Sequence, residues 1–148
     1  MSNPNPVTFE ATCLVRDTCL CLHLQRAARA IARRFDAAFR PFDLTNGQFS
    51  LLMSLNRAEP ANMRGVADLL AMDRTTLTAA LKPLERRGLV TVAVDPEDRR
   101  SRRLALTRAG HDLLAAALPV WQREHAAIDA GFGGDRPERL RADLRALS

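Results

Sequence analysis

Several kinds of residue are scarce in this sequence. Its 148 residues include no tyrosine, one tryptophan and three cysteines, and Lys82 is the only lysine, so arginine supplies nearly all of the positive charge. An odd, small number of cysteines argues against a framework of disulfide bonds. The sequence has no run of the roughly 18 apolar residues that a membrane-spanning helix needs, and no signal-like segment begins it. We therefore expect a cytoplasmic protein without a membrane segment.

Motifs of catalysis and of cofactor binding are also missing. The sequence contains three histidines, and none belongs to an HExxH motif or to a Ser/His/Asp arrangement. No carboxylate pair lies in an apolar setting, and no glycine-rich loop of the kind that holds a dinucleotide is present. The sequence thus predicts neither an enzyme nor a bound cofactor.

The composition is that of a small basic domain. Lys and Arg number 22 against 17 Asp and Glu, which gives a net charge of +5 and a sequence pI near 10.3. With 47% hydrophobic residues, the chain is long enough for one domain with a modest core. An excess of arginine suits phosphate groups and narrow minor grooves. The composition is therefore compatible with nucleic-acid binding.

Residues 62–87 have the pattern of two short helices joined by a tight turn. Apolar residues recur at three- and four-residue spacing in both halves, and Asp73 is a suitable N-cap for the second helix. A helix-turn-helix of this kind places its second helix in the major groove of DNA. The apolar stripe of that helix consists of Leu77, Leu81 and Leu84.

The opposite side of the second helix carries hydroxyl groups and cations but no carboxylate. Hydroxyls can meet base edges or phosphates, and cations can meet phosphate or guanine, so this face suits a major groove, although an ordinary solvated face has similar residues. The predicted base-reading residues are Arg74, Thr75, Thr76 and Thr78, and the predicted backbone contacts are Lys82 and Arg86.

Residues 90–107 have the pattern of a β-hairpin with a cationic tip. Valines alternate with smaller residues in the first arm and leucines alternate in the second, which is the two-residue period of a half-buried strand. Pro96 and the acidic residues around it favour a turn. A solvated tip would also be charged, but the preceding helix-turn-helix favours contact with phosphate. The tip is expected to present Arg99, Arg100, Arg102 and Arg103 to solvent.

Three segments together resemble the MarR family of bacterial transcription regulators. They are Asp73-Arg-Thr-Thr-Leu-Thr, Leu84-Glu-Arg-Arg-Gly-Leu-Val and Asp95-Pro-Glu-Asp-Arg-Arg, and the resemblance extends over nearly the whole chain. It implies a homodimer that binds a pseudo-palindromic double-stranded DNA operator, with helix 74–86 in the major groove and the wing tip in the minor groove. By position, the family's wing pair falls on Asp98 and Arg100. Arg99 and Arg102 are then expected to contact the backbone.

The expected fold is mainly α with a small β-hairpin. Residues 43–106 would form the winged helix-turn-helix, and residues 14–42 and 107–148 the helices through which two copies dimerise. The first of these helices is expected from Thr18 to Phe39. The expected function is a DNA-binding transcription regulator, a repressor released by a small molecule or by oxidation. The alternative is a winged module for dimerisation or protein interaction without operator binding, which would be expected to show an apolar recognition face.

The cysteines leave the nature of the effector open. Cys19 and His23 would share a helix face, but two ligands are fewer than the four of a structural zinc site, so no metal site is predicted. Cys21 is positioned like the reactive cysteine of the OhrR-like members of the family, although the tyrosines that accompany it there are missing. Cys21 also lies on an apolar stripe, where a thiol fills a core.

A small aromatic ligand is the third possibility for the effector. The resemblance allows such a ligand between the dimerisation helices and the winged region. Its pocket would use an arginine and four aromatic side chains, which would equally suit an ordinary core: Phe35, Phe39, Phe49 and Trp121.

Overall fold

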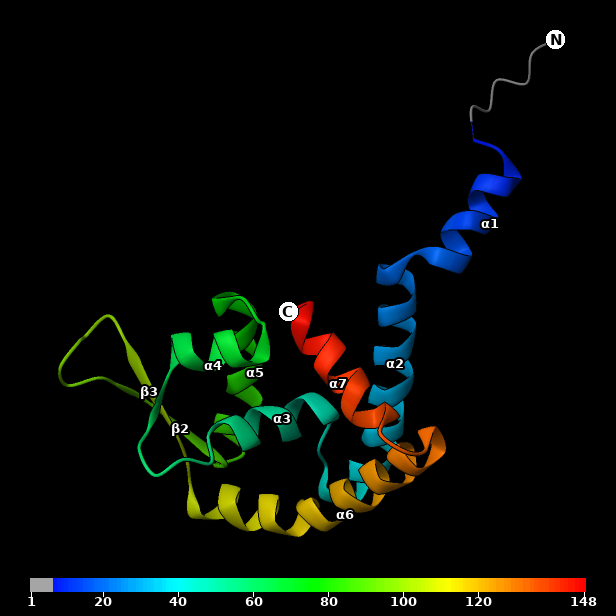
Figure 1. The fold of residues 1–148 in the computed structure, drawn as a ribbon. Helices are drawn as coiled ribbons and strands as arrows, with labels where there is room; N and C mark the ends of the chain where they lie inside the picture. The colour runs from blue at the N-terminus through cyan, green and yellow to red at the C-terminus, as the bar shows by residue number, and fades with distance from the viewer. Residues whose placement is uncertain (1–6) are drawn as a thin grey trace. The chain divides into compact units, whose positions relative to one another are not determined.

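The computed structural model describes residues 7–148, which belong to two compact units (Figure 1). The first unit extends to Arg34 and the second comprises Phe35–Ser148. The elements in chain order are α1 (Phe9–Thr18), α2 (Leu20–Phe39), a short 3-10 helix (Arg40–Phe42), α3 (Asn46–Ser54), β1 (Ala61–Asn62), α4 (Met63–Leu70), α5 (Arg74–Arg86), β2 (Val90–Val94), β3 (Arg102–Leu106), α6 (Arg108–Phe132) and α7 (Arg136–Ala146).

The first unit differs from the sequence prediction by one additional helix. The predicted helix from Thr18 is wrong at its start, because Cys19 has extended backbone angles (φ −69°, ψ 111°) and separates α1 from α2. Helix α1 begins at a cap in which the Thr8 hydroxyl oxygen accepts a hydrogen bond from the Ala11 amide. None of its ten residues is buried. A helix that buries no face has no strong apolar period, which explains why the sequence did not indicate it.

The apolar stripe predicted along α2 is buried only at its end. Phe35 and Phe39 belong to the core of the second unit. In contrast, Leu20, Leu24 and Ile31 are exposed, with fractions of 64%, 38% and 44%. The helical period of the stripe is thus correct, but most of its apolar side chains have no covering surface in a single copy.

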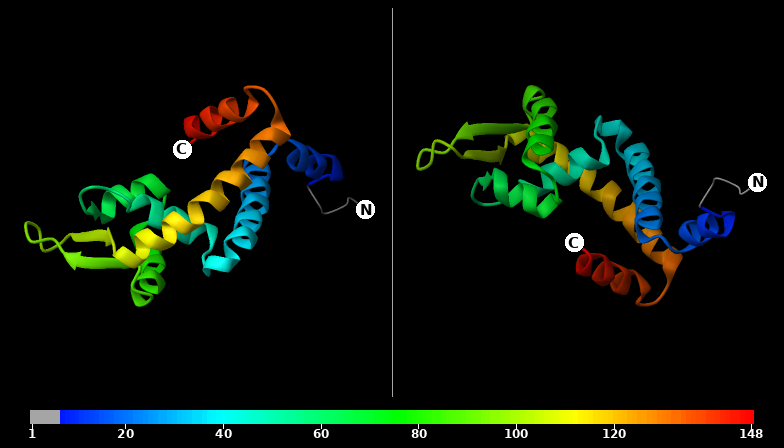
Figure 2. Two further views of the ribbon diagram at one scale, coloured as in Figure 1. Left: turned by 90° about the horizontal axis from the view of Figure 1, so that it is seen from below. Right: turned by 90° about the horizontal axis from the view of Figure 1, so that it is seen from above.

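A three-stranded antiparallel sheet forms the winged part of the second unit, with strand order β1-β3-β2. Strands β2 and β3 pair from Val90 opposite Leu106 to Val94 opposite Arg102, and Figure 2 shows this ribbon extending beyond the neighbouring helices. β1 pairs with β3 at Leu104. The sequence did not predict β1, because a strand of two residues is too short to show an alternating pattern.

The prediction that four arginines lie at the tip of the hairpin is wrong for two of them. Arg102 and Arg103 belong to strand β3, so only Arg99 and Arg100 lie in the connecting segment 95–101. Arg103 forms an ion pair with Asp95 at 3.3 Å, where β2 ends. The ladder thus continues further toward the tip than the leucine alternation indicated, because arginine side chains can occupy strand positions once their charge is paired or solvated.

The core of the second unit lies beneath α5 and joins helices to the sheet. Side chains that are almost completely buried come from successive elements: Phe39, Leu52, Val66, Leu77, Leu84, Val90 and Leu104. Pro83 lies within α5 without ending it. The predicted apolar stripe of the recognition helix is confirmed, since all three of its leucines are buried.

The long helix α6 starts against the end of α5. The Thr107 hydroxyl donates to the Gly88 carbonyl at 2.6 Å and accepts from the Gly110 amide at 3.1 Å, which confirms the predicted cap. The Thr107 amide donates to the Leu89 carbonyl at 3.0 Å. Gly110 lies so close that a Cβ atom on it would be 2.1 Å from that carbonyl oxygen. The chain therefore needs glycine at residue 110 because of a close backbone approach.

Helix α7 is held against α6 by ion pairs. The Arg141 guanidinium contacts Asp129 of α6 at 3.0 Å and Glu138 of its own helix at 2.7 Å. These contacts raise the pKa of Arg141, and its hydrogen bonds lower the pKa of Asp129. The leucines of α7 and of its C-cap are exposed to between 39% and 61%: Leu140, Leu144 and Leu147.

We expect Gly110→Ala to destabilise the protein by about 1–3 kcal/mol, because the new methyl group would force the Leu89 carbonyl away. Gly131→Ala is the matched control, since Gly131 lies in the same helix and a Cβ there would meet nothing within 4 Å. The control should be neutral or stabilising by up to about 1 kcal/mol. Urea unfolding followed by circular dichroism measures both, and equal effects of the two variants would contradict the role of the close approach.

Candidate nucleic-acid interface

Helix α5 is fixed by its buried side and its N-terminal cap. The Asp73 carboxylate accepts a hydrogen bond from the Thr76 amide and another from the Thr76 hydroxyl, both at 2.8 Å. These bonds, first of all the one from the amide, lower the pKa of Asp73 below its ordinary value. The cap predicted from the sequence is confirmed. Because Leu77 and Leu81 are buried, the rotation of α5 about its axis is also set.

The exposed face of α5 borders a shallow groove of about 380 Å³. The residues that line it are Arg74, Thr75, Thr78, Ala79 and Lys82. All five are exposed, and none carries a negative charge. The structure therefore places three of the four predicted base-reading residues on one face. Thr76 is not among them, and its hydroxyl is committed to the Asp73 cap.

The wing tip is ordered by its carboxylates acting on the backbone. Asp98 accepts a hydrogen bond from the Arg100 amide at 3.0 Å, and Asp95 accepts one from the Glu97 amide at 2.9 Å. The latter bond is the largest cause of the lowered pKa of Asp95. The resemblance implied that Asp98 holds Arg100; in the structure the contact is made with the backbone of Arg100.

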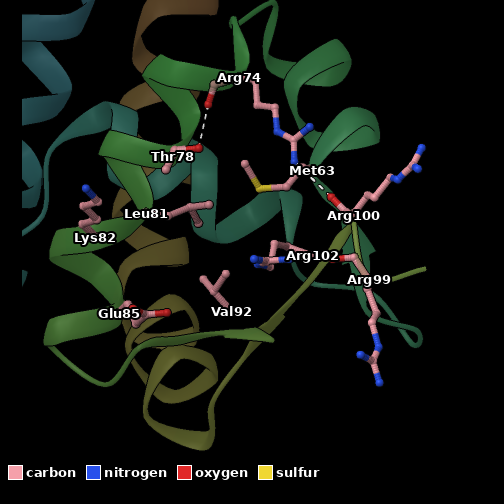
Figure 3. Close-up of a pocket in the computed structure, with 10 residues that line it drawn as sticks. All are labelled: Met63, Arg74, Thr78, Leu81, Lys82, Glu85, Val92, Arg99, Arg100 and Arg102. Atoms are coloured by element: carbon pink, nitrogen blue, oxygen red, sulfur yellow. Dashed lines mark hydrogen bonds between the residues drawn. The ribbon is translucent and has the colours of Figure 1, made fainter. Parts of the chain in front are cut away.

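A second groove, of about 450 Å³, lies between α5 and the wing (Figure 3). Its floor is apolar, and the rest of its lining consists of five cationic side chains, Thr78 and Glu85. Figure 3 shows Arg102 turned into the groove, whereas Arg99 and Arg100 point away from it. The lining residues are Met63, Arg74, Thr78, Leu81, Lys82, Glu85, Val92, Arg99, Arg100 and Arg102.

Hydrogen bonds to backbone carbonyls hold the two arginines on the inner side of this groove. Arg74 donates to the Arg100 carbonyl at 3.4 Å, which links the start of α5 to the wing tip (Figure 3). Arg102 donates to the carbonyls of Arg99 and Ser101 at 3.3 and 3.2 Å. Because a carbonyl group carries no net charge, these hydrogen bonds do not neutralise the positive charges of Arg74 and Arg102. The groove can therefore receive an anionic group at its cationic rim and apolar atoms at its floor.

Three residues of the larger groove were not predicted from the sequence. Met63 of α4, Glu85 of α5 and Val92 of β2 line the space between α5 and the wing, and only the packing of these three elements brings them together. Arg86 is exposed on the last turn of α5 but lines neither groove. The predicted DNA contacts remain predictions, although the structure brings most of them to one surface.

The predicted aromatic pocket has a different composition in the structure. A cavity of about 330 Å³ is lined by Phe49 and Trp121. Phe35 and Phe39 do not line it; both are buried in the core, where Phe39 stacks on Phe49 with ring centroids 4.6 Å apart. No arginine lines the cavity. Its other lining residues are Ser50, Met53, Ser54, Leu69, Leu70 and Leu118.

The cysteines lie in the first unit and are all free thiols. Cys21 is exposed, so its interpretation as a buried core residue is wrong for a single copy of the chain. Cys13 and Cys19 are half-buried. Cys19 lies outside the regular helix, so it does not share a helix face with His23 as expected. Residues 7–148 contain no group of three potential metal ligands, and no helix among them is long and apolar enough to span a membrane.

Comparison with solved structures first defines the class of fold. The DNA complex of the transcriptional regulator MosR of Mycobacterium tuberculosis has a TM-score of 0.80 and 38% identity, and the match covers 88% of this chain and 93% of that one. The repressor CouR of Rhodococcus jostii, bound to a 23-mer DNA duplex, has a TM-score of 0.80 and 30% identity, with coverages of 90% and 94%. The predicted winged-helix architecture is confirmed.

Sequence comparison identifies the family. Residues 44–101 match the MarR family. The transcriptional regulator SarZ of Staphylococcus saprophyticus is 30% identical over 64% of each chain, and the organic hydroperoxide resistance transcriptional regulator of Bacillus subtilis is 29% identical over 68% of this chain and 69% of its own length. The chain belongs to the MarR family, as the sequence predicted, and the predicted class, a DNA-binding transcription regulator, agrees with these proteins. The chain spans 62–64% of the length of the SarZ proteins that it matches first.

We expect the contribution of the Asp73 cap to stability to be lost in acid. Because the pKa of Asp73 is lower in the folded protein, its ionised form stabilises the fold above the pKa of an unfolded aspartate, about 3.9, and this stabilisation disappears as the pH falls through the folded value. Asp73→Asn cannot titrate and serves as the reference. The stability of the wild type relative to this variant, measured by urea unfolding, should decrease from pH 7 to pH 2.5. A constant difference would contradict the assignment.

Proposed function

We propose that two copies of this chain bind a pseudo-palindromic operator in double-stranded DNA and repress transcription. The observation that carries this proposal is the cationic lining on both sides of α5, with five cationic side chains and one carboxylate around the larger groove. Such a surface attracts the phosphate backbone and is repelled by other cations. A protein-interaction module would be expected to present an apolar surface here instead.

In this proposal α5 enters the major groove and the wing tip enters the adjacent minor groove. Thr75 and Thr78 lie on the face that would meet base edges, together with Arg74 at the start of the helix. Lys82, Arg86, Arg99 and Arg102 contact phosphates. Arg100 is exposed and points away from the groove in Figure 3, and it is the residue that enters the minor groove. Arginine suits this role because a narrow minor groove has an enhanced negative potential.

Dimerisation supplies the symmetry that a pseudo-palindromic operator requires. We assign it to residues 14–42 and 107–148. Apolar side chains exposed within these ranges support the assignment, because a lone copy leaves them in contact with water. They include Leu14, Leu20, Ile31, Leu140, Leu144 and Leu147.

The proposal contains no catalytic step. Members of the MarR family are transcription regulators, and the role proposed here requires DNA rather than a substrate. It places the protein in the cytoplasm, where a bacterial regulator meets its operator.

We expect Arg100→Ala to weaken binding to the operator by about 1–3 kcal/mol, because the variant loses the side chain that enters the minor groove. Arg108→Ala is the matched control: it removes the same charge from an exposed residue at the start of α6, where Arg108 pairs with Asp112. Fluorescence anisotropy with the upstream region of the gene, at several KCl concentrations, measures both. A dissociation constant that does not respond to salt would remove the proposed function, and equal losses in both variants would remove the specific role of Arg100.

For the release of DNA we propose oxidation of Cys21. The exposed thiol supports this regulation, as does the similarity to a hydroperoxide-resistance regulator. In the reaction the Cys21 thiolate attacks a hydroperoxide, the O–O bond breaks, and the products are a sulfenic acid and an alcohol. Cys19 lies two residues before Cys21, at the break between α1 and α2, and its thiol is the one proposed to condense with the sulfenic acid.

Cumene hydroperoxide should release the wild type from DNA and should fail to release Cys21→Ser. Cys13→Ser is the control and should respond like the wild type, since its thiol lies in α1, outside the pair that reacts. Anisotropy before and after addition of the peroxide, followed by a reductant, measures the release and its reversal. Equal release of the wild type and Cys21→Ser would exclude this thiol as the sensor.

A further inference from the structure

Two of the threonine hydroxyls on α5 have no proton left to donate to an outside partner. The Thr78 hydroxyl donates to the Arg74 carbonyl at 2.8 Å, and the Thr76 hydroxyl donates to the Asp73 carboxylate at 2.8 Å. A carbonyl and an ionised carboxylate only accept hydrogen bonds, so the single proton of each hydroxyl is used within the helix. Each of these hydroxyls therefore offers only lone pairs to an outside partner.

We infer that Thr78 reads the operator as a hydrogen-bond acceptor and binds the exocyclic amine of an adenine or a cytosine. The inference rests on the proposed function, in which α5 occupies the major groove. In that groove the hydrogen-bond donors are the N6 amine of adenine and the N4 amine of cytosine, whereas guanine and thymine present acceptors. A hydroxyl that can only accept is thus matched to two of the four bases.

The same proton count argues against a phosphate as the partner of Thr78. Phosphate oxygens accept hydrogen bonds, so a hydroxyl without a free proton would face them with one acceptor against another. Releasing the proton would require breaking the 2.8 Å bond to the Arg74 carbonyl. Thr78 is therefore assigned to a base edge, whereas threonines in general contact either bases or backbone.

The position of Thr78 distinguishes it from Thr76. Residues two apart on a helix point about 200° apart, so the two side chains cannot face the same groove of DNA. Thr78 lines both the outer groove of α5 and the groove toward the wing. Thr76 lines neither, and its hydroxyl completes the cap. Thr78 is the reading residue, and Thr76 holds the start of the helix.

Thr75 provides the internal comparison. It lies about 60° from Thr78 around the helix and lines the same outer groove. Within the described chain its hydroxyl makes no hydrogen bond, so its proton is available to a phosphate or a base acceptor. Thr75 can thus both donate and accept a hydrogen bond, whereas Thr78 beside it can only accept one.

The experiment uses the full chain and begins with selection of a binding sequence from a randomised duplex library. Each adenine or cytosine of one half-site is then replaced by the base analogue that lacks only the exocyclic amine. Dissociation constants are measured by anisotropy for the wild type, Thr78→Val, Thr78→Ser and Thr75→Val. Valine has the shape of threonine without the hydroxyl, and serine keeps the hydroxyl, so the pair separates hydrogen bonding from packing.

We expect one position of the half-site at which removal of the amine weakens the wild type about three- to tenfold, the range of one hydrogen bond. At that position Thr78→Val should bind both duplexes equally, and at the weakened level. Thr78→Ser and Thr75→Val should retain the dependence on the amine. Melting curves confirm that all variants are folded.

Two results would overturn the inference in different ways. If Thr78→Val keeps the same dependence on the amine at every position as the wild type, Thr78 does not read an amine. If the wild type selects no sequence and binds without salt dependence, the proposed function fails, and this outcome is seen before any variant is compared. Loss of amine dependence in Thr75→Val alone would assign the contact to Thr75 and also contradict the proposal.

Discussion

The arrangement of the winged part depends on one backbone carbonyl, that of Leu89. It lies between the end of α5 and the first strand of the wing, accepts a hydrogen bond from the Thr107 amide, and leaves no room for a side chain at Gly110. The Thr107 hydroxyl adds a bond to the neighbouring Gly88 carbonyl. Through these contacts the recognition helix, both long strands and α6 meet at one point. Because each contact involves the backbone, the relative orientation of these elements does not depend on long, flexible side chains.

The cationic character of the surface arises because nearby carboxylates are occupied elsewhere. Asp73 caps α5, Asp98 accepts from the backbone of the wing tip, and Asp95 pairs with Arg103. None of these three carboxylates neutralises Arg74, which donates its hydrogen bond to the Arg100 carbonyl. Like charges at this density are costly in an isolated protein, and they become favourable when phosphate groups replace the missing counterions. The local structure thus keeps the surface ready for an anionic partner.

The sequence predicted those features that have a local signal. The stripe of Leu77, Leu81 and Leu84, the caps at Asp73 and Thr107, and the two arms of the wing could all be read from spacing and residue type. Each of these signals reflects a preference that operates within a few residues along the chain.

Other features depend on tertiary contacts that spacing does not report. The strand β1 exists only because β3 lies beside it, and α1 buries no face that would give it a period. The exposure of Cys21 depends on what covers the apolar stripe of α2. At the candidate site, the direction of each hydroxyl proton could not be predicted at all, because it follows from the atoms that Thr76 and Thr78 meet in the folded helix.

The hydrogen bonds of α5 also determine which of its residues can be substituted without disturbing the helix. A substitution at Thr76 disturbs the cap of the helix, whereas Thr75 and Ala79 are exposed and, within the described chain, carry no side-chain hydrogen bond. Substitutions at Thr75 and Ala79 would therefore change what α5 presents to DNA without removing a hydrogen bond of the cap. Part of the exposed face of α5 can thus vary independently of the hydrogen bonds that fix the start of the helix.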